Sequence, residues 1–283
     1  MKWRGRQGSR NIEDRRSTQS TKAGGMGIVG MLAVITVNYF LGVDISPLVG
    51  GGGIGGQTYI QRGELTREDR DIGEFVSVTL ADTEQIWGSL FQKEAGMRYN
   101  PATMVLFKGV TGSPCGNASG ATGPFYCPAD KKVYLDTDFF NTLGNRLGAK
   151  CDFAAAYVVA HEVAHHVQNE LGILSRATAA RKRMSTIDSN LVSVMIELQA
   201  DCFSGIWARY AEERLGTLER GDLAEAINAA KQIGDDTLQR NAGRRPMPHT
   251  FTHGTSEQRQ RWFEIGYRQA KMASCDTFSS QRL

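Results

Sequence analysis

Residues 157–169 read YVVAHEVAHHVQN, and this stretch predicts both a buried helix and a metal site. His161 and His165 are four residues apart, a spacing that places both imidazoles on one face of an α-helix. Glu162 follows the first histidine, so its carboxylate is expected beside a bound ion, where it can accept a proton from water. We therefore predict His161 and His165 as ligands of a single Zn²⁺ ion and Glu162 as a catalytic base.

The residues around this motif predict that the helix is buried. AAAYVVA precedes His161, and Glu162 is the only Asp, Glu, Lys or Arg between Phe153 and Gln168. A carboxylate in such a setting is costly to desolvate, and a nearby cation would offset that cost. The alternative is a purely structural helix whose histidines bond only to backbone groups or carboxylates.

A second apolar stretch, residues 190–208, supplies the candidate for a third zinc ligand. Its only charged residues are Glu197 and Asp201, which are four apart and share one face of the expected helix. A catalytic zinc site commonly has three protein ligands and leaves the fourth position to water. We assign Glu197 as the third ligand and Asp201 as the group that accepts a hydrogen bond from a ligating histidine. The alternative is a solvated polar stripe.

Three further histidines complete the set of five. His166 is rotated by about 100° from His165 and is expected to be a packed residue rather than a ligand. His253 lies in a glycine-containing loop before the last expected helix, and we predict it as a second catalytic residue that donates to the oxyanion. It could instead replace Glu197 as a ligand. A role for His249 is less favoured.

The N-terminal region predicts attachment to a bacterial cytoplasmic membrane. Residues 24–43 carry no charge and would form a helix about 30 Å long, enough to span a bilayer. Residues 1–23 contain seven Lys or Arg against two acidic residues, so we expect them to form a cytoplasmic tail. Residues 44–70 are glycine-rich and are expected to form a tether, with residues 71–283 as the zinc peptidase domain on the periplasmic or extracellular side. The alternatives for the apolar stretch are a buried core helix and a cleaved signal peptide.

The distribution of charge argues against a nucleic-acid partner. The whole chain carries +3, of which residues 1–23 supply +5, so the remaining residues carry −2. A slightly acidic body without a basic and aromatic stripe lacks the electrostatic footprint that binding to nucleic acid requires. We therefore expect no nucleic acid among the partners.

The cysteines agree with an oxidising compartment. Cys115 and Cys127 lie in one loop rich in Gly, Ser and Pro, and we predict that they pair. A second bridge, from Cys202 to Cys275, would tie the C-terminal region to the core. Cys151 would then belong to neither of the two expected bridges. The alternative is a set of unpaired buried thiols, because connectivity cannot be read from one sequence. A zinc site made of cysteines is less favoured because no close pair is present.

The pattern of apolar residues predicts a helix-dominated α+β domain with a small sheet. Helices are expected over residues 71–94, 137–147, 151–170, 186–214, 218–240 and 256–271, and strands over 103–108 and 132–136. The strand at 132–136 is expected to offer an edge with which an extended peptide could pair.

Several stretches together resemble a bacterial family described as "putative neutral zinc metallopeptidase". The similar segments are WRGR, NIEDRR, CGNASGATGPFYCPADKKVYLD, YVVAHEVAHHVQN, ELQADCFSGIWA, FTHGTSEQRQRWFEIGY and CDTF. The resemblance extends over nearly the full chain. It implies a zincin-like fold, one zinc ion, a membrane anchor and proteolytic activity, and it does not imply a particular substrate.

The sequence therefore predicts a membrane-anchored zinc peptidase that hydrolyses peptide or protein substrates with Glu162 as general base. One alternative is a catalytically silent, zinc-stabilised binding or assembly factor tethered to the membrane. A structural zinc site has no need of Glu162 and usually has four protein ligands, which disfavours this alternative. Another is a soluble cytosolic hydrolase.

Overall fold

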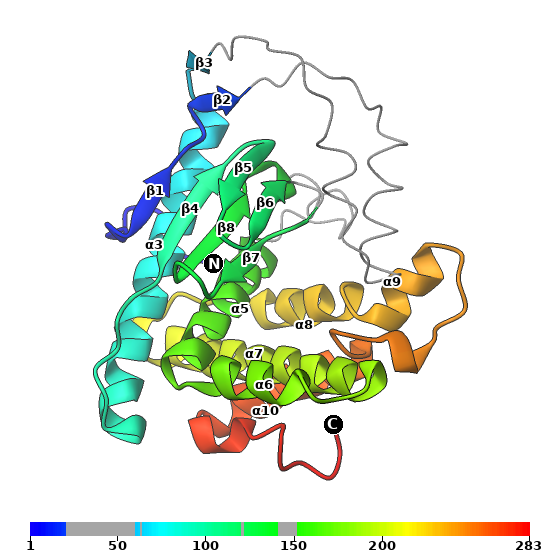
Figure 1. Cartoon of the computed structure of the whole chain (residues 1–283). Helices are drawn as coiled ribbons and strands as arrows, with labels where there is room; N and C mark the ends of the chain where they lie inside the picture. Colours follow the sequence, from blue (N-terminus) through cyan, green and yellow to red (C-terminus); the bar gives the residue numbers. More distant parts are fainter. Residues whose placement is uncertain (21–59, 63, 120–121, 141–151) are drawn as a thin grey trace, which may run out of the picture.

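Helices predominate among the residues that the computed structural model describes, which are 1–20, 60–62, 64–119, 122–140 and 152–283. A small sheet lies beside the long helix α3, and the other helices form a layer next to it (Figure 1). The predicted α+β class with a dominant helical part is therefore confirmed. The expected membrane helix at residues 24–43 lies outside the described residues.

The main sheet has four strands in the order β1 (Ile12–Asp14), β4 (Thr103–Phe107), β8 (Lys132–Asp136) and β7 (Phe125–Cys127). Strand β4 runs parallel to β1 and β8, and β7 is antiparallel to β8. Both strands predicted from the sequence are present. The expectation that residues 132–136 offer a sheet edge is wrong, because β8 is paired on both sides.

Two short antiparallel pairs and two disulfides complete the strand region. Strand β2 (Thr18–Ser20) pairs with β3 (Ile60–Arg62), and β5 (Val110–Ser113) pairs with β6 (Gly116–Ser119). Both predicted disulfides are present: Cys115–Cys127 joins the β5–β6 turn to β7, and Cys202–Cys275 joins two helical segments. Residue 151 lies outside the described part of the chain.

The helices agree with most of the predicted ranges. They are α3 (Arg67–Leu90), followed by a π-helical turn (Phe91–Ala95), α5 (Asp152–Glu170), α6 (Ile173–Arg181), α7 (Thr186–Leu215), α8 (Asp222–Gln232), α9 (Asp235–Asn241) and α10 (Ser256–Gln269), with 3₁₀ turns η2 (Pro248–Thr250) and η3 (Met272–Cys275). Helix α6 was not predicted. Of the expected helix at 137–147, only residues 137–140 are described.

The expected helix at 218–240 is divided into α8 and α9 around Gly234. A Cβ atom at Gly234 would lie 2.4 Å from the backbone nitrogen of Ser256, so the absence of a side chain lets this turn contact the start of α10. The break is therefore a tertiary packing feature that helical periodicity could not indicate.

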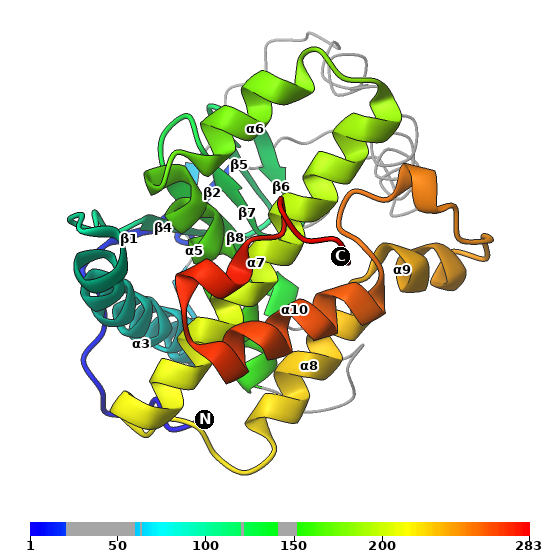
Figure 2. The same ribbon diagram turned by 90° about the horizontal axis from the view of Figure 1, so that it is seen from below.

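Helices α7 and α10 cross in close backbone contact (Figure 2). A Cβ atom at Gly205 would lie 2.0 Å from the carbonyl oxygen of Phe263, and one at Gly266 would lie 1.8 Å from that of Cys202. Glycine is required at both positions because any side chain would separate the helices. This close approach brings side chains of α10 to the metal site.

Helix α7 is the core helix of the protein. Among the described helices, it alone is long and apolar enough to cross a membrane, but 72% of its most apolar window is buried inside the protein. A buried helix with this composition is typical of the core of a globular domain. It faces α5, and the two helices together carry the predicted metal ligands.

Residues 1–20 pack against the body rather than forming a separate tail. Met1 and Trp3 are buried, and the indole of Trp3 makes an edge-to-face contact with Phe75. The guanidinium of Arg6 lies 2.5 Å from the carboxylate of Asp82, and β1 adds a strand to the sheet. Residues 1–20, which were expected to belong to a separate tail, therefore pack as part of the body.

Candidate metal centre

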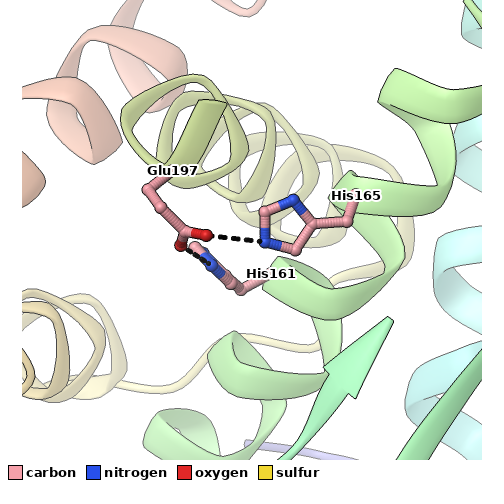
Figure 3. Close-up of side chains that lie close together, drawn as sticks. All are labelled: His161, His165 and Glu197. Atoms are coloured by element: carbon pink, nitrogen blue, oxygen red, sulfur yellow. Dashed lines mark hydrogen bonds and ion pairs between the residues drawn. The ribbon is translucent and has the colours of Figure 1, made fainter. Parts of the chain in front are cut away.

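Helices α5 and α7 bring the three predicted ligands together. His161 and His165 lie on one face of α5, and Glu197 of α7 points between their rings (Figure 3). The Nε2 atom of His161 lies 3.1 Å from Glu197 Oε2, and that of His165 lies 3.5 Å from Glu197 Oε1. Each residue offers one potential ligand atom to a single point, and these atoms all lie within 4.8 Å of one another.

The other ring nitrogen of each histidine already has a partner. His161 Nδ1 lies 2.9 Å from Asp201 Oδ1, and His165 Nδ1 lies 2.9 Å from Gln168 Oε1. Carboxylate and amide oxygens only accept hydrogen bonds, so each Nδ1 donates its proton outward. With Nδ1 engaged in this way, it is Nε2 of each ring that faces Glu197 and that would bind an ion once its proton is lost, which is the tautomer that a metal site requires.

The donor set and its spacing fit zinc. Metal–ligand bonds of about 2.0–2.1 Å in tetrahedral geometry place neighbouring ligand atoms about 3.3 Å apart. The separations of 3.1 and 3.5 Å from Glu197 to the two imidazoles lie on either side of that value. In the described residues, no fourth His, Cys, Asp or Glu joins the group. Two imidazoles and one carboxylate are a ligand set found in catalytic zinc sites.

The charged groups of the candidate site shift one another's pKa values. Burial lowers the pKa of His161, but the carboxylates of Asp201 and Glu197 outweigh this effect and raise it to about 10. Burial raises the pKa of Glu197, whereas the neighbouring histidines, His165 first, hold it well below its usual range. The carboxylates and imidazoles thus stabilise one another's charges, and a bound cation would take the place of the protons on the imidazoles.

Glu162 is buried on the same helix, within electrostatic reach of both histidines. It is only 8% exposed, and burial raises the pKa of its carboxyl group, while His165 and His161 act in the opposite direction. A carboxylate with a raised pKa beside a metal-bound water is suited to accept a proton and to return it. The position therefore agrees with the role of general base that the motif suggested.

Behind His161 stands a charged hydrogen-bond network. Asp201 is fully buried, and it accepts hydrogen bonds from Arg259 Nε at 2.8 Å and Arg259 Nη2 at 3.0 Å. The hydroxyl of Tyr157 donates to the same carboxylate at 2.5 Å. Burial raises the pKa of Asp201, but Arg259 and His161 reverse this and lower it. Asp201 is thus an ionised acceptor, as expected for a residue that orients a ligand.

Behind His165 stands a neutral network. The side-chain nitrogen of Gln168 donates to the carbonyl of Ile196 at 2.8 Å and to Gln199 Oε1 at 3.0 Å. Gln199 in turn donates to the carbonyl oxygen of Cys275 at 2.9 Å. These contacts fix the Gln168 amide so that its oxygen faces His165. The chain of hydrogen bonds ends at the Cys202–Cys275 disulfide.

His253 lies close to the site and is held by Asp235. Its Nδ1 is 3.2 Å from Asp235 Oδ1, while Asp235 Oδ2 accepts from the backbone N–H groups of Thr252, His253 and Gly254. Burial lowers the pKa of His253, but Glu197 first and then Asp235 raise it. The imidazole is therefore within the electrostatic reach of Glu197 without joining the three converging ligands.

The structure separates the two remaining histidines from the metal centre. His166 is buried as expected, with Nε2 2.6 Å from the carbonyl of Asn100 and Nδ1 3.1 Å from the hydroxyl of Tyr126. Burial lowers its pKa. His249 is exposed, and its carbonyl accepts a hydrogen bond from Asn190. Both positions argue for structural roles.

Four residues around the ligands were not predicted from the sequence: Tyr157, Gln168, Asp235 and Arg259. The first two could have been found, because they lie four residues before His161 and three after His165 on one helix. Asp235 and Arg259 belong to α9 and α10, and no sequence spacing relates them to the motif.

The converging ligands do not line the apolar cavity of about 530 Å³ between α6, α7 and the C-terminal segment. Leu171, Met184, Phe203 and Phe278 contribute to its wall, as does Gln199. Gln199 therefore links this cavity to the network behind His165. The candidate ligands lie elsewhere, within electrostatic reach of His253.

Comparison with known proteins identifies the family. Residues 1–278 match the family described as "Putative neutral zinc metallopeptidase". The chain is 40% identical over 288 aligned positions to uncharacterized protein YpfJ of Escherichia coli K12, a match that covers 98% of this chain and 99% of YpfJ. It is 38% identical over 231 positions to uncharacterized protein Rv2575 of Mycobacterium tuberculosis H37Rv, covering 77% of this chain and 75% of that protein. No solved structure matches.

The chain therefore belongs to the neutral zinc metallopeptidase family. The family supports a peptidase role, zinc as the metal, and peptides or proteins as the substrate class. The resemblance found in the sequence motifs is confirmed over nearly the whole chain.

Proposed function

We propose that this protein is a membrane-attached zinc peptidase in which His161, His165 and Glu197 hold one zinc ion. The observation that carries the proposal is the convergence of two Nε2 atoms and one carboxylate, with both Nδ1 atoms already donating outward. That arrangement favours metal binding over a simple ion-pair cluster. Three protein ligands rather than four favour a catalytic site over a structural one.

Zinc in such a site supplies Lewis acidity, which lowers the pKa of water and polarises a substrate carbonyl. Glu162 accepts the proton of the attacking water and then donates it to the leaving amine, so that the carboxylate is regenerated. The burial of Glu162 raises its pKa toward the range in which one group can perform both transfers. The donor that stabilises the oxyanion is His253, whose raised pKa favours the protonated form.

The proposed location is outside the cytoplasm, with attachment through residues 24–43. Two disulfides support an oxidising compartment, since such bonds are rare in the cytosol. The uncharged stretch of 20 residues is long enough to enter a bilayer. Together these features favour a peptidase that acts on peptides or proteins at the outer face of the cytoplasmic membrane.

The test uses the full-length protein in detergent, loaded with zinc, and a mixed peptide library. We expect about one zinc per chain in the parent and in Glu162→Gln, and cleavage only by the parent. Glu170→Gln is the matched control, because Glu170 lies on the same helix but pairs with Lys131 away from the ligands. It should bind zinc and cleave peptides like the parent.

The alternative function, a zinc-stabilised binding or assembly factor, predicts a different outcome of the same experiment. It expects zinc in all three proteins and cleavage by none. Equal cleavage by the parent and Glu162→Gln would also refute the proposed mechanism, because the general base would then be dispensable. Absence of zinc from the parent would refute the assigned site itself.

A further inference from the structure

We propose that Arg259 is the positioning residue of the metal centre, acting through Asp201 on His161. The proposal rests on zinc binding at His161, His165 and Glu197, and it does not depend on which substrate is cleaved. Arg259 is 2% exposed, and its guanidinium makes two parallel hydrogen bonds with Asp201, from Nε to Oδ2 and from Nη2 to Oδ1. This fork-to-fork geometry fixes the plane of the carboxylate.

The fixed carboxylate determines the tautomer of His161. Oδ1 of Asp201 accepts from His161 Nδ1 at 2.9 Å, so the proton of the imidazole must lie on the side away from Glu197. Without the guanidinium, the buried carboxylate of Asp201 would lose the two hydrogen bonds that fix its plane. A rotated carboxylate would no longer hold Nδ1 of His161 in place, and the ring could turn so that Nε2 no longer faces Glu197 and His165.

Arg259 itself is held in place by groups outside the site. Its Nη1 donates to the carbonyl of Ile233 at 3.2 Å, and its Nη2 lies 3.4 Å from the hydroxyl of Tyr157. Helix α10, which carries it, begins at a capping box formed by Thr255 and Gln258. Its backbone contacts with α7 through Gly205 and Gly266 then fix the distance between Arg259 and Asp201.

The experiment compares zinc affinity in the full-length parent, Arg259→Gln and Arg259→Lys by competition with a chelator. Loss of an outer-shell partner typically weakens metal binding by about 10–100-fold, and we expect Arg259→Gln in this range. Arg259→Lys should recover part of the loss, because lysine restores the charge but not the planar fork. Arg268→Gln, on the exposed end of the same helix, is the control and should bind zinc like the parent.

A second readout separates positioning from folding. The cobalt-substituted proteins should show an altered visible spectrum in Arg259→Gln, because the ligand field of His161 changes, and the parent spectrum in Arg268→Gln. If the folded fraction of Arg259→Gln keeps parent zinc affinity and the parent cobalt spectrum, Arg259 is only a core residue and the proposal is wrong. If the parent binds no zinc, the proposed function fails instead.

An independent observation concerns membrane topology, and from it we infer that residues 1–20 lie on the same side of the membrane as the metal centre. Trp3 is buried against Phe75, β1 pairs in parallel with β4, and Arg16 is buried beside α3, where it donates to the carbonyl of Asp69. A bilayer with a hydrocarbon core of about 30 Å cannot separate segments that share one core.

The pairing of β2 with β3 supports the same conclusion. Ser20 lies opposite Ile60 in this antiparallel pair, so the chain leaves the body and returns to it at one place. Residues 20 and 60, which flank the region with the uncharged stretch, therefore lie on the same side of the membrane as the body. This inference replaces the expectation that residues 1–23 remain in the cytoplasm while the body is exported.

Thiol labelling of spheroplasts tests this inference. In full-length protein with Cys151→Ser, Arg10→Cys reports on the N-terminal residues and Arg98→Cys on the body, and both positions are exposed. A membrane-impermeant maleimide should give the two variants the same result, either both labelled or both labelled only after lysis. Labelling of one variant but not the other before lysis would overturn the inference.

Discussion

The two histidines of the candidate zinc site are neighbours on one helix, yet the groups behind them differ in kind. His161 is backed by an ionised carboxylate that is paired with a buried guanidinium, whereas His165 is backed by two neutral amides and a backbone carbonyl. A carboxylate raises the basicity of an imidazole more strongly than an amide oxygen does. We therefore expect His161 to be the stronger ligand and the one more sensitive to its surroundings.

The largest effect is expected from His253, which belongs neither to the charged network behind His161 nor to the neutral network behind His165. Replacing His253 with Ala should lower kcat by about 10²–10³-fold, which is the usual result of removing one oxyanion donor. Zinc content should remain that of the parent, because His253 is not among the converging ligands. Peptide hydrolysis and metal analysis on the same sample check both points. Loss of zinc in His253→Ala would instead make it a ligand.

The difference between the two histidines also predicts how zinc affinity depends on pH. Burial lowers the pKa of both, but nearby carboxylates raise that of His161 to about 10 and raise that of His165 as well. Zinc must displace these protons, so apparent affinity should rise about tenfold per pH unit for each proton released, or about 100-fold between pH 6 and 8 for one. Chelator competition across this range measures the slope.

The stability of the metal-free protein should change in the opposite direction. A histidine with a raised pKa in the folded state stabilises the fold below its unfolded value of about 6.5. That contribution is lost as the pH rises toward about 10. Urea unfolding in the presence of a chelator should therefore give a lower midpoint at pH 9 than at pH 6. A midpoint that rises over this range would contradict the assigned charges.

A direct comparison of the two networks comes next in size. Asp201→Asn should weaken zinc binding by about 100-fold, and Gln168→Met by about tenfold, the upper and lower ends of the usual range for such partners. The difference reflects the loss of a charged acceptor in one case and a neutral one in the other. Equal effects would show that the charge behind His161 has no special role. Tyr126→Phe, beside His166, is the control and should leave zinc affinity unchanged.

The smallest effect is expected from the far end of the neutral network. Removing the Cys202–Cys275 bridge by a double change to Ala should cost about 4 kcal/mol of folding free energy, because the closed loop is long. Its effect on zinc affinity should be less than tenfold, since Cys275 reaches His165 only through Gln199 and Gln168. Thermal unfolding and chelator competition separate the two. A loss of zinc affinity larger than tenfold would mean that the hydrogen bonds through Gln199 and Gln168 transmit a change at Cys275 to His165 more strongly than expected.

Local periodicity carried much of what could be predicted. The ranges of α5 and α7, and the face shared by His161 and His165, follow from residues that are close in sequence. Both disulfides were also predicted, because each cysteine pair joins a loop or end to a core segment. The interior place of β8 and the break at Gly234 were not, because each depends on a neighbour distant along the chain.

The sequence by itself indicated the metal chemistry, since two imidazoles at helical spacing with a glutamate between them are typical of zinc sites. Only the tertiary structure decided which groups stand behind each ligand. Arg259 is 58 residues from Asp201, and Cys275 is 76 residues from Gln199, so no periodic pattern connects them. The same holds for Trp3 and Phe75, whose contact makes the first residues part of the body. Long-range packing is a property of the whole chain, which is why a local motif cannot specify it.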